Sequence, residues 1–199
     1  MSSSNDIKIC ILGSAAVGKT CLLYRFVKES FLIGSSSTIG VAYQSQKIQL
    51  PNSGAPPITL GLWDTAGAEI FNSLSALYTR NSQIALVCFD PQEEKTFKEA
   101  QRWISSLKSD EPKCKIFLIA TKMDLLGSKL WCPSESSVVA WARENGITQV
   151  HRTSALTGQG CKEVYKSLCE VATHIFLEET PSGRISVEVS RPPQESCSC

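Results

Sequence analysis

The feature that most constrains the fold is a stretch near the start of the chain, Gly13-Ser14-Ala15-Ala16-Val17-Gly18-Lys19-Thr20. It has the form G-x-x-x-x-G-K-[ST], follows the apolar residues 9–12 and leads into the helix-compatible residues 21–27. Strand, glycine loop and helix are the context of a phosphate-binding loop, in which N–H groups and the positive end of the helix dipole point at phosphate oxygens. Lys19 is expected to reach the outer phosphates, and Thr20 to offer its hydroxyl to Mg²⁺. Taken alone, the stretch is also compatible with an ordinary glycine loop before a core helix.

Apolar runs bounded by turn residues alternate along the chain with segments of helical periodicity. Strands are predicted at residues 7–12, 58–63, 84–89, 115–120 and 149–153, and helices near residues 17–29, 71–77, 95–107, 134–144 and 160–176. Such alternation predicts an α/β fold in which helices cover both faces of a mostly parallel sheet. Ligands of such folds bind at the carboxyl ends of the strands, where the glycine loop also lies.

One more strand is predicted at residues 43–50, directly before the turn-rich residues 51–57 and the strand at 58–63. A hairpin of this kind places one antiparallel strand at an edge of the sheet. With 42% hydrophobic and 20% charged residues in a length of 199, the chain has the composition of one globular domain. We assign this domain to residues 1–178, and a flexible tail that contains prolines, serines and glutamates to residues 179–199.

Composition argues against several other classes of protein. The formal net charge of +1 gives no general field that would attract nucleic acid. No C-x-x-C pair occurs among the nine cysteines, which argues against a structural zinc site and favours reduced thiols in a cytosolic protein. The first residues lack the charged and apolar regions of a signal peptide, and the longest apolar runs, such as residues 84–89, are too short to span a bilayer. We therefore expect the protein on the cytosolic side of membranes.

Two further stretches are candidates for completing a magnesium site. Thr38 lies in a serine-rich loop before the edge strand, and its hydroxyl suits the ion, although most loop threonines have no such role. Asp64 ends a predicted strand and is placed to hold the ion through water, while the N–H of Gly67 can approach a terminal phosphate closely. An aspartate in such a turn is also commonly a helix cap.

Two later strand ends carry candidates for recognition of a base. The first is Thr121-Lys122-Met123-Asp124, whose final carboxylate can accept two parallel N–H bonds, a pair of donors that guanine offers and adenine does not. Lys122 is expected to lay its stem along the ring, although a solvated charge pair would give the same pattern. At the second strand end, a backbone N–H within residues 153–155 is expected to meet the guanine carbonyl oxygen.

These stretches, in this order and each at a strand end, resemble those of the Ras superfamily of small GTPases, and most of all its Rab branch. The resemblance covers residues 7–176 and rests on the motifs G-S-A-A-V-G-K-T, S-T-I-G-V-A-Y, W-D-T-A-G-A-E, T-K-M-D and T-S-A-L. It implies the fold of a P-loop NTPase small G domain, with a six-stranded sheet, and GTP or GDP with Mg²⁺ as cofactors. It also implies a switch, because the third phosphate and Mg²⁺ hold the segments around Thr38 and Gly67, which loosen when that phosphate is lost.

The resemblance assigns roles to individual residues. It implies that Thr20, Thr38 and Asp64 hold Mg²⁺, and that Lys19 and Gly67 act in hydrolysis. Phe31 matches the base-stacking phenylalanine of the family. The full set of nucleotide contacts that it implies is Ser14, Ala15, Ala16, Val17, Gly18, Lys19, Thr20, Cys21, Phe31, Thr38, Gly67, Thr121, Lys122, Asp124, Ser154, Ala155 and Leu156.

The chain departs from the family at the residue that orients the attacking water, because Ala68 occupies the place of a glutamine. A methyl group neither donates nor accepts a hydrogen bond, so we expect slow intrinsic hydrolysis and a dominant GTP form. Activating proteins of the Rab family can supply an arginine and a glutamine from outside, which implies that hydrolysis stays possible. Milder departures are Thr121 in place of an asparagine, and Ala42 and Ile70 in place of an acid and a base near the switches.

Two other functions stay open on the sequence alone. One is a largely GTP-locked, hydrolysis-deficient membrane scaffold that recruits effectors, which Ala68 would explain. The other is a P-loop kinase acting on a small molecule. The kinase is disfavoured because residues 121–124 would then be unexplained and no lid-like cluster of arginines is visible.

The final residues, Cys197-Ser198-Cys199, resemble the C-x-C ending of Rab proteins that receive two geranylgeranyl chains. One chain usually anchors weakly, and the tail has no basic patch to help it, so we expect lipidation of both Cys197 and Cys199. The resemblance then implies a location on the cytoplasmic face of intracellular membranes, with a cytosolic pool. It further implies an exchange factor, a GTPase-activating protein, a prenyl transferase escort, a GDP-dissociation inhibitor, and effectors that read the nucleotide state through Tyr43, Trp63 and Tyr78.

Overall fold

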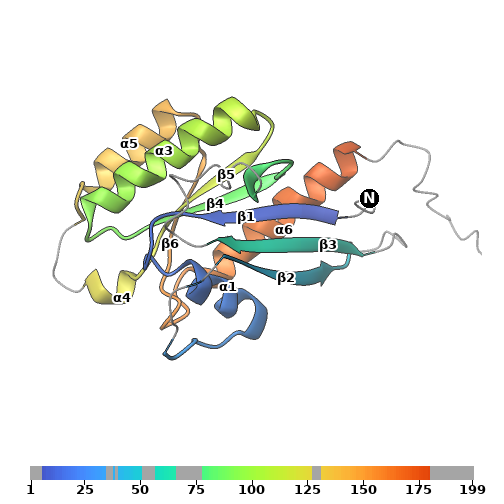
Figure 1. Cartoon of the computed structure of the whole chain (residues 1–199), viewed down its shortest axis with the longest axis horizontal. Coiled ribbons are helices and arrows are strands. Elements are labelled where there is room, and N and C mark those ends of the chain that lie inside the picture. The colour runs from blue at the N-terminus through green and yellow to red at the C-terminus, as the bar shows by residue number, and fades with distance from the viewer. Residues whose placement is uncertain are drawn as a thin grey trace, which may run out of the picture.

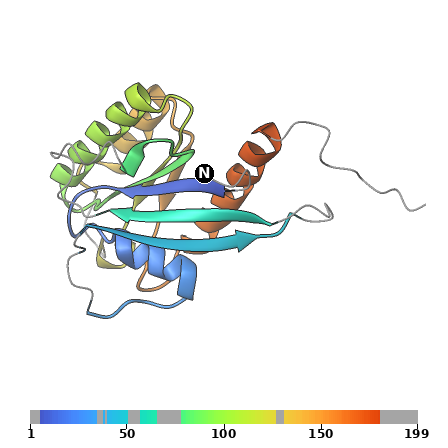
Figure 2. The same ribbon diagram turned by 45° about the vertical axis from the view of Figure 1, so that its right-hand side comes forward.

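The protein is built around one six-stranded sheet with the strand order β2-β3-β1-β4-β5-β6 (Figure 1). The computed structural model describes residues 6–34, 38, 40–50, 57–65, 78–126 and 131–179. Its strands are β1 (Asp6–Leu12), β2 (Val41–Ile48), β3 (Ile58–Thr65), β4 (Ile84–Phe89), β5 (Lys115–Ala120) and β6 (Gln149–Arg152). All neighbouring strands pair in parallel except β2, which runs antiparallel to β3 at one edge, where Figure 2 shows the two strands beside β1. The expected α/β fold with one antiparallel edge strand is therefore confirmed.

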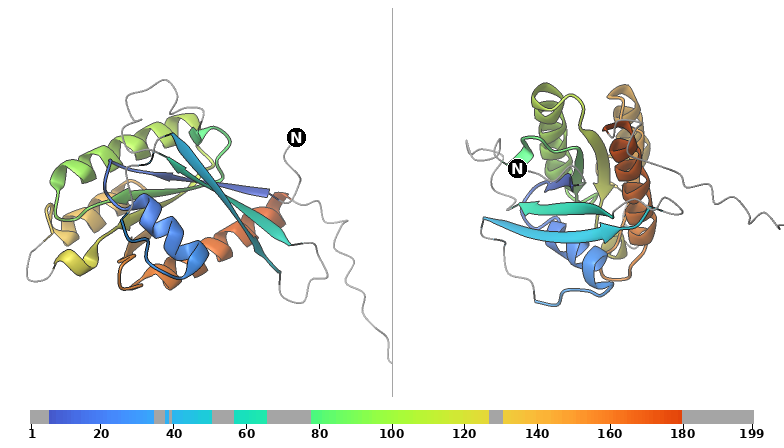
Figure 3. Two further views of the ribbon diagram at one scale, coloured as in Figure 1. Left: turned by 60° about the horizontal axis from the view of Figure 1, so that its bottom comes forward. Right: turned by 90° about the vertical axis from the view of Figure 1, so that its right-hand side faces the viewer.

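Helices lie on both faces of the sheet. They are α1 (Lys19–Lys28), α3 (Glu94–Asp110), α4 (Met123–Leu126), α5 (Glu135–Glu144) and α6 (Cys161–Glu179). In Figure 3, α3 lies on one side of the sheet and α6 on the other. The apolar residues of α3 at positions 97, 100, 103, 104 and 107 are all buried, as their helical spacing predicts.

Two hydrophobic clusters, one on each face of the sheet, form the core. In β1, Ile9 and Ile11 pack in the cluster that includes α1 and α6, whereas Cys10 and Leu12 pack in the cluster that includes α3 and α5. Side chains of a strand point alternately to opposite faces, so a strand covered on both faces is apolar along its length. The complete burial of β4 has the same cause.

Several element ends differ from the sequence-based expectation. The edge strand occupies Val41–Ile48 and not residues 43–50, because its ladder with β3 ends at the pair Ile48 and Ile58. Helix α1 begins two residues later than expected, since Gly18 caps it with a φ of 95°. The short helix α4 was not expected. The expected helix at residues 71–77 and most of the turn at 51–57 lie outside the described residues.

The carboxyl-terminal end of the fold leaves one expectation open. Helix α6 ends at Glu179, and residues 180–199 lie outside the described residues, so a domain boundary at residue 178 stays a prediction. Among the helices of the described ranges, none is long and apolar enough to cross a bilayer.

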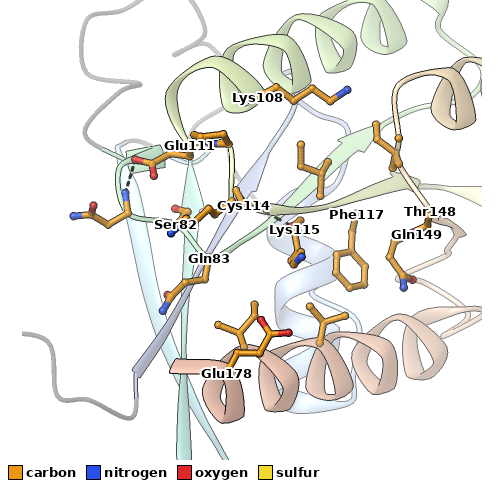
Figure 4. A pocket seen from close by; sticks show the side chains of 18 of the residues that line it. Ser82, Gln83, Lys108, Glu111, Cys114, Lys115, Phe117, Thr148, Gln149 and Glu178 are labelled. Atoms are coloured by element: carbon orange, nitrogen blue, oxygen red, sulfur yellow. Dashed lines mark hydrogen bonds between the residues drawn. The ribbon is translucent and has the colours of Figure 1, made fainter. Parts of the chain in front are cut away.

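The two ends of the sheet differ in their surroundings. The phosphate loop follows β1 at the carboxyl ends of the parallel strands. At their amino-terminal ends lies a groove with a volume of about 1030 Å³, bordered by the last turns of α3 and α6. Figure 4 shows Phe117 of β5 and Glu178 of α6 among its lining side chains. This groove is lined by neither the phosphate loop nor the base-recognition residues expected from the sequence.

Candidate nucleotide-binding site

The phosphate loop wraps tightly because of its glycines. Gly13 has a φ of 134°, and a Cβ atom built there would lie 2.2 Å from the carbonyl oxygen of Cys88 in β4. Gly18 has a φ of 95°, a value in the left-handed region that favours glycine. No side chain caps the start of α1, so the orientation of the first N–H groups toward the loop is set by the backbone alone. The loop therefore has the form of an anion-binding helix start.

Lys19 lies folded over the loop. Its side chain is nearly buried, with an exposed fraction of 5% for the residue, and Nζ donates to the carbonyl oxygens of Gly13 and Ser14 at 2.9 Å each. Two carbonyls of the same turn thus hold the ammonium group over the loop. This is the position from which a lysine can meet phosphate oxygens.

Three residues proposed for magnesium come together at the other end of the loop. The hydroxyl of Thr20 donates to Asp64 Oδ2 at 2.6 Å, and Thr20 Oγ1 lies 2.8 Å from Thr38 Oγ1. The second carboxylate oxygen of Asp64, Oδ1, is buried and has no hydrogen-bond partner among the described residues. Burial raises the pKa of the Asp64 carboxyl, while the Thr20 hydroxyl and the charge of Lys19 act in the opposite direction.

This donor set fits Mg²⁺. The ion prefers oxygen ligands and is usually held in proteins by one or two side chains together with water and phosphate oxygens. Hydroxyls of Thr20 and Thr38 and an orphaned carboxylate oxygen of Asp64 meet that preference. In the described ranges, no group of three or more His, Cys, Asp or Glu side chains is arranged to hold a metal ion.

The residues expected to read the base lie at the ends of β5 and β6. Asp124 accepts a hydrogen bond at Oδ1 from the hydroxyl of Ser154, and Ser154 Oγ in turn accepts from the N–H of Thr157 at 3.1 Å. Lys122 has a φ of 56°, and its Nζ pairs with the buried Asp90 Oδ2 at 2.9 Å. The sequence predicted Asp124, Lys122 and Ser154, but gave no sign that Asp90 would hold Lys122.

Thr121 joins the base-recognition end of the site to the phosphate loop. Its Oγ1 lies 2.6 Å from the carbonyl oxygen of Val17 and 2.9 Å from that of Phe89, and both can share its proton. The side chain is buried between these segments. Thr121 has a shorter side chain than the asparagine expected at this position, but its hydroxyl still links residues 121–124 to the loop.

Two residues that sequence reasoning missed complete the supporting contacts. Arg25 of α1 donates from Nε to the carbonyl oxygen of Ala155 at 2.7 Å and from Nη2 to that of Leu156 at 2.8 Å. Glu99 of α3 accepts a hydrogen bond from the hydroxyl of Ser14 in the phosphate loop. Neither residue belongs to a local motif, so no short-range signal in the sequence could have found them.

Two of the three aromatic residues expected to meet effectors form a pair. The ring of Tyr43, which is 52% exposed, lies 5.0 Å from that of Trp63, centroid to centroid. Gly61 makes room for this pair, because a Cβ atom there would lie 3.3 Å from Tyr43 Cε2. Lys8 Nζ lies 5.3 Å from the centroid of the Trp63 ring. In the described structure Tyr78 makes no ring contact with Tyr43 or Trp63.

For some expected site residues the structure gives burial and no role in the site. Phe31 and Cys21 are partly buried, and Ala15 and Ala16 are exposed. Gly67 and Ala68, which were expected to act in hydrolysis, lie outside the described residues, and so do the tail residues Cys197 and Cys199.

Comparisons with known proteins show which family the chain belongs to. Residues 8–174 match the Ras family. The chain is 32% identical over 191 residues to the Ras-related protein Rab-5A of Dictyostelium discoideum, which covers 94% of this chain and 92% of that protein. It is 31% identical to Rab-4 of the same organism, over 97% of this chain and 96% of Rab-4. It is 30% identical to the GTP-binding protein YPT52 of Saccharomyces cerevisiae, over 97% of this chain and 99% of YPT52. The chain therefore belongs to the Ras family and is a Rab-like small GTPase.

Proposed function

We propose that the protein is a GTP/GDP switch that regulates vesicle and membrane trafficking, and that the site described above binds the nucleotide. The observation that carries this proposal is the meeting of Thr20, Thr38 and Asp64, which come from α1, the segment before β2, and β3. When bound, Mg²⁺ supplies positive charge that neutralises phosphate oxygens and the carboxylate. Thr38 is the member of this set that lies outside any helix or strand. This suits a residue that releases Mg²⁺ when the third phosphate is lost.

The remaining contacts assign a part to each end of the site. Lys19 and the N–H groups at the start of α1 bind the phosphates. Asp124 accepts two N–H bonds from guanine with its carboxylate, which Ser154 orients through the hydrogen bond at Oδ1. The pair with Asp90 holds Lys122 beside the base. A nucleotide with adenine would leave the Asp124 carboxylate without its two donors, a loss that strongly disfavours binding.

Hydrolysis in this proposal is slow without help. Ala68 has no group that can orient a water molecule, so the attacking water lacks one of its usual hydrogen bonds. A GTPase-activating protein that brings its own polar side chains would restore the rate. The GTP form therefore accumulates until such a partner binds.

Partners and membrane attachment follow from the surface and the tail. The exposed ring of Tyr43 and the half-buried ring of Trp63 form an aromatic pair at the edge of the sheet, and such residues are favoured in protein interfaces. We propose that effectors contact them together with Tyr78. Lipid chains on Cys197 and Cys199 would place the protein on the cytoplasmic face of intracellular membranes, with extraction by a GDP-dissociation inhibitor giving a cytosolic pool. The intact mass of the protein from native cells tests this, and a mass with neither cysteine modified would remove the membrane attachment.

The test of the hydrolysis step is a single-turnover assay on the GTP-loaded full-length protein. Ala68→Gln is expected to hydrolyse GTP at least about tenfold faster than the wild type, since it restores an orienting group. Ala68→Leu is the matched control, because it adds a side chain of similar length without hydrogen-bonding groups, and it should stay slow. Equal rates for the wild type and Ala68→Gln would contradict the assignment. If an added activating protein gave no turnover in any variant, a GTP-locked scaffold would be the better description.

A further inference from the structure

The phosphate loop has a contact with α3 that the established chemistry of the site does not use. Ser14, the second residue of the loop, donates its hydroxyl hydrogen to Glu99 Oε2. Ser14 is buried, and the side chain of Glu99 is only 13% exposed, so this carboxylate sits largely out of water beneath the loop. A buried carboxylate is costly unless it accepts hydrogen bonds, so the contact binds the two segments to each other.

Few other partners are present for Glu99. Lys95 Nζ lies 3.9 Å from Glu99 Oε1, but the lysine side chain is 87% exposed, and an exposed ion pair of this length contributes little. The hydroxyl of Ser14 is thus the one close donor to this carboxylate in the described structure. Removing that hydroxyl would leave the carboxylate poorly paired, with consequences for the position of the loop.

Ser14 also connects this contact to the phosphate-binding lysine. The carbonyl oxygen of Ser14 is one of the two that accept from Lys19 Nζ at 2.9 Å. The neighbouring Gly13 packs directly against the Cys88 carbonyl, so the first turn of the loop is held by β4 on one side and by α3 on the other. A shift of Ser14 therefore moves a group that orients Lys19.

We propose that Glu99 is a positioning residue for nucleotide binding, which acts through Ser14 on the first turn of the phosphate loop and on Lys19. It does not itself touch the nucleotide. The proposal rests on the proposed function, since it assumes that the loop binds phosphates. Its consequence is that α3 is coupled to the nucleotide site through Ser14. A substitution at Glu99 therefore changes the rate at which the nucleotide dissociates.

What matters in this arrangement is the hydrogen-bond acceptor and not the negative charge. Glu99→Gln keeps an oxygen that can accept from Ser14, whereas Glu99→Ala removes it. The two variants therefore separate a positioning role from a general electrostatic one. A charge effect would appear in both variants, whereas a positioning effect would appear mainly in Glu99→Ala.

The test is the rate of GDP dissociation from the full-length protein with Mg²⁺ present, measured for wild type, Ser14→Ala, Glu99→Ala, Glu99→Gln and the double alanine variant. We expect each single alanine variant to release GDP about tenfold faster than the wild type, and Glu99→Gln to stay within about threefold of it. The double variant should be no faster than the faster single variant, because removing the carboxylate also removes the cost of leaving it unpaired. Glu94→Ala is the matched control. It lies on the same helix and loses a pair of 2.9 Å with Lys98, but both side chains are exposed and pair with each other, not with Ser14.

Several results would overturn the proposal. Wild-type GDP release from Glu99→Ala would do so, as would effects of Ser14→Ala and Glu99→Ala that multiply in the double variant. An equal change in Glu94→Ala, or a lower melting temperature with unchanged release, would reduce Glu99 to a purely structural role. If Glu99→Ala does not fold, the Ser14→Ala and Glu99→Gln pair still decides, since only the first should speed release. A wild type that binds no guanine nucleotide would instead refute the proposed function.

Discussion

The guanidinium group of Arg25 spans from α1 to the loop after β6, where its Nε lies 2.7 Å from the carbonyl oxygen of Ala155. A second bond, from Nη2, reaches the carbonyl oxygen of Leu156 at 2.8 Å, and Nη1 donates to the backbone carbonyl oxygen of Glu29 at 2.7 Å. Helix α1 begins at Lys19 in the phosphate loop. One side chain thus ties the loop expected to meet the base to the helix expected to meet the phosphates.

This relationship makes Arg25 a target for mutation. Arg25→Ala should free the backbone of residues 155 and 156, and we expect it to speed GDP dissociation by about tenfold, because charge-assisted hydrogen bonds of this kind contribute roughly 1.5–3 kcal/mol. Lys28→Ala, at the exposed end of the same helix, is the control and should release GDP like the wild type. An Arg25→Ala protein with an unchanged release rate would show that the bonds do not support the base site.

Asp124 should decide which base is bound. Asp124→Asn places an amide where guanine needs an acceptor for its second N–H, so we expect the affinity for GDP to fall at least about 100-fold. The folded state should be little affected, because the amide oxygen can still accept from Ser154. Titration with labelled GDP, beside a melting curve of each protein, measures both effects. Equal GDP affinity in the two proteins would rule out Asp124 as the group that reads guanine.

His151 predicts a pH dependence of stability. Its ring stacks on Phe117 with an interplanar angle of 14°, and burial lowers its pKa below the usual value. The unfolded chain then takes up a proton near pH 6.5, at a higher pH than the folded chain does. The contribution of the neutral His151 ring to the free energy of unfolding is therefore complete above about pH 6.5. It is lost as the pH falls toward the lower pKa of the folded state.

The variant His151→Phe keeps an aromatic ring on Phe117 and removes the titration. Its melting temperature should fall less between about pH 7.5 and pH 5.5 than that of the wild type. His174→Gln, which changes the other of the chain's two histidines, on the exposed side of α6, shows whether any difference belongs to the His151 ring. A wild type and a His151→Phe variant with the same loss of melting temperature would contradict the prediction.

The sequence predicted those parts of the molecule that local patterns determine. The buried face of α3 follows from a period of 3.6 residues, and the phosphate loop follows from glycines that can adopt positive φ angles. Asp64, Asp124 and Ser154 could be placed together because parallel strands end at one edge of the sheet. In the first two cases the relevant signal lies within a few neighbouring residues, and in the third it lies in the alternation of strands and helices.

The rest depended on contacts between distant segments. Arg25 meets Ala155 across 130 positions of the chain, and Ser14 meets Glu99 across 85. Nothing near Arg25 or Glu99 in the sequence distinguishes them from solvated charges on a helix surface. The predicted bounds of the edge strand β2 were wrong for a related reason. Its register is set by pairing with β3 and not by its own apolar pattern.

The most direct measurement is the identity of the nucleotide that the full-length protein retains when it is purified with Mg²⁺, determined by chromatography after denaturation. We expect guanine nucleotide in a stoichiometric amount, with a higher ratio of GTP to GDP in the wild type than in Ala68→Gln. Retention of adenine nucleotides, or failure of GDP to bind at all, would contradict the assignment of this site to a guanine-nucleotide switch.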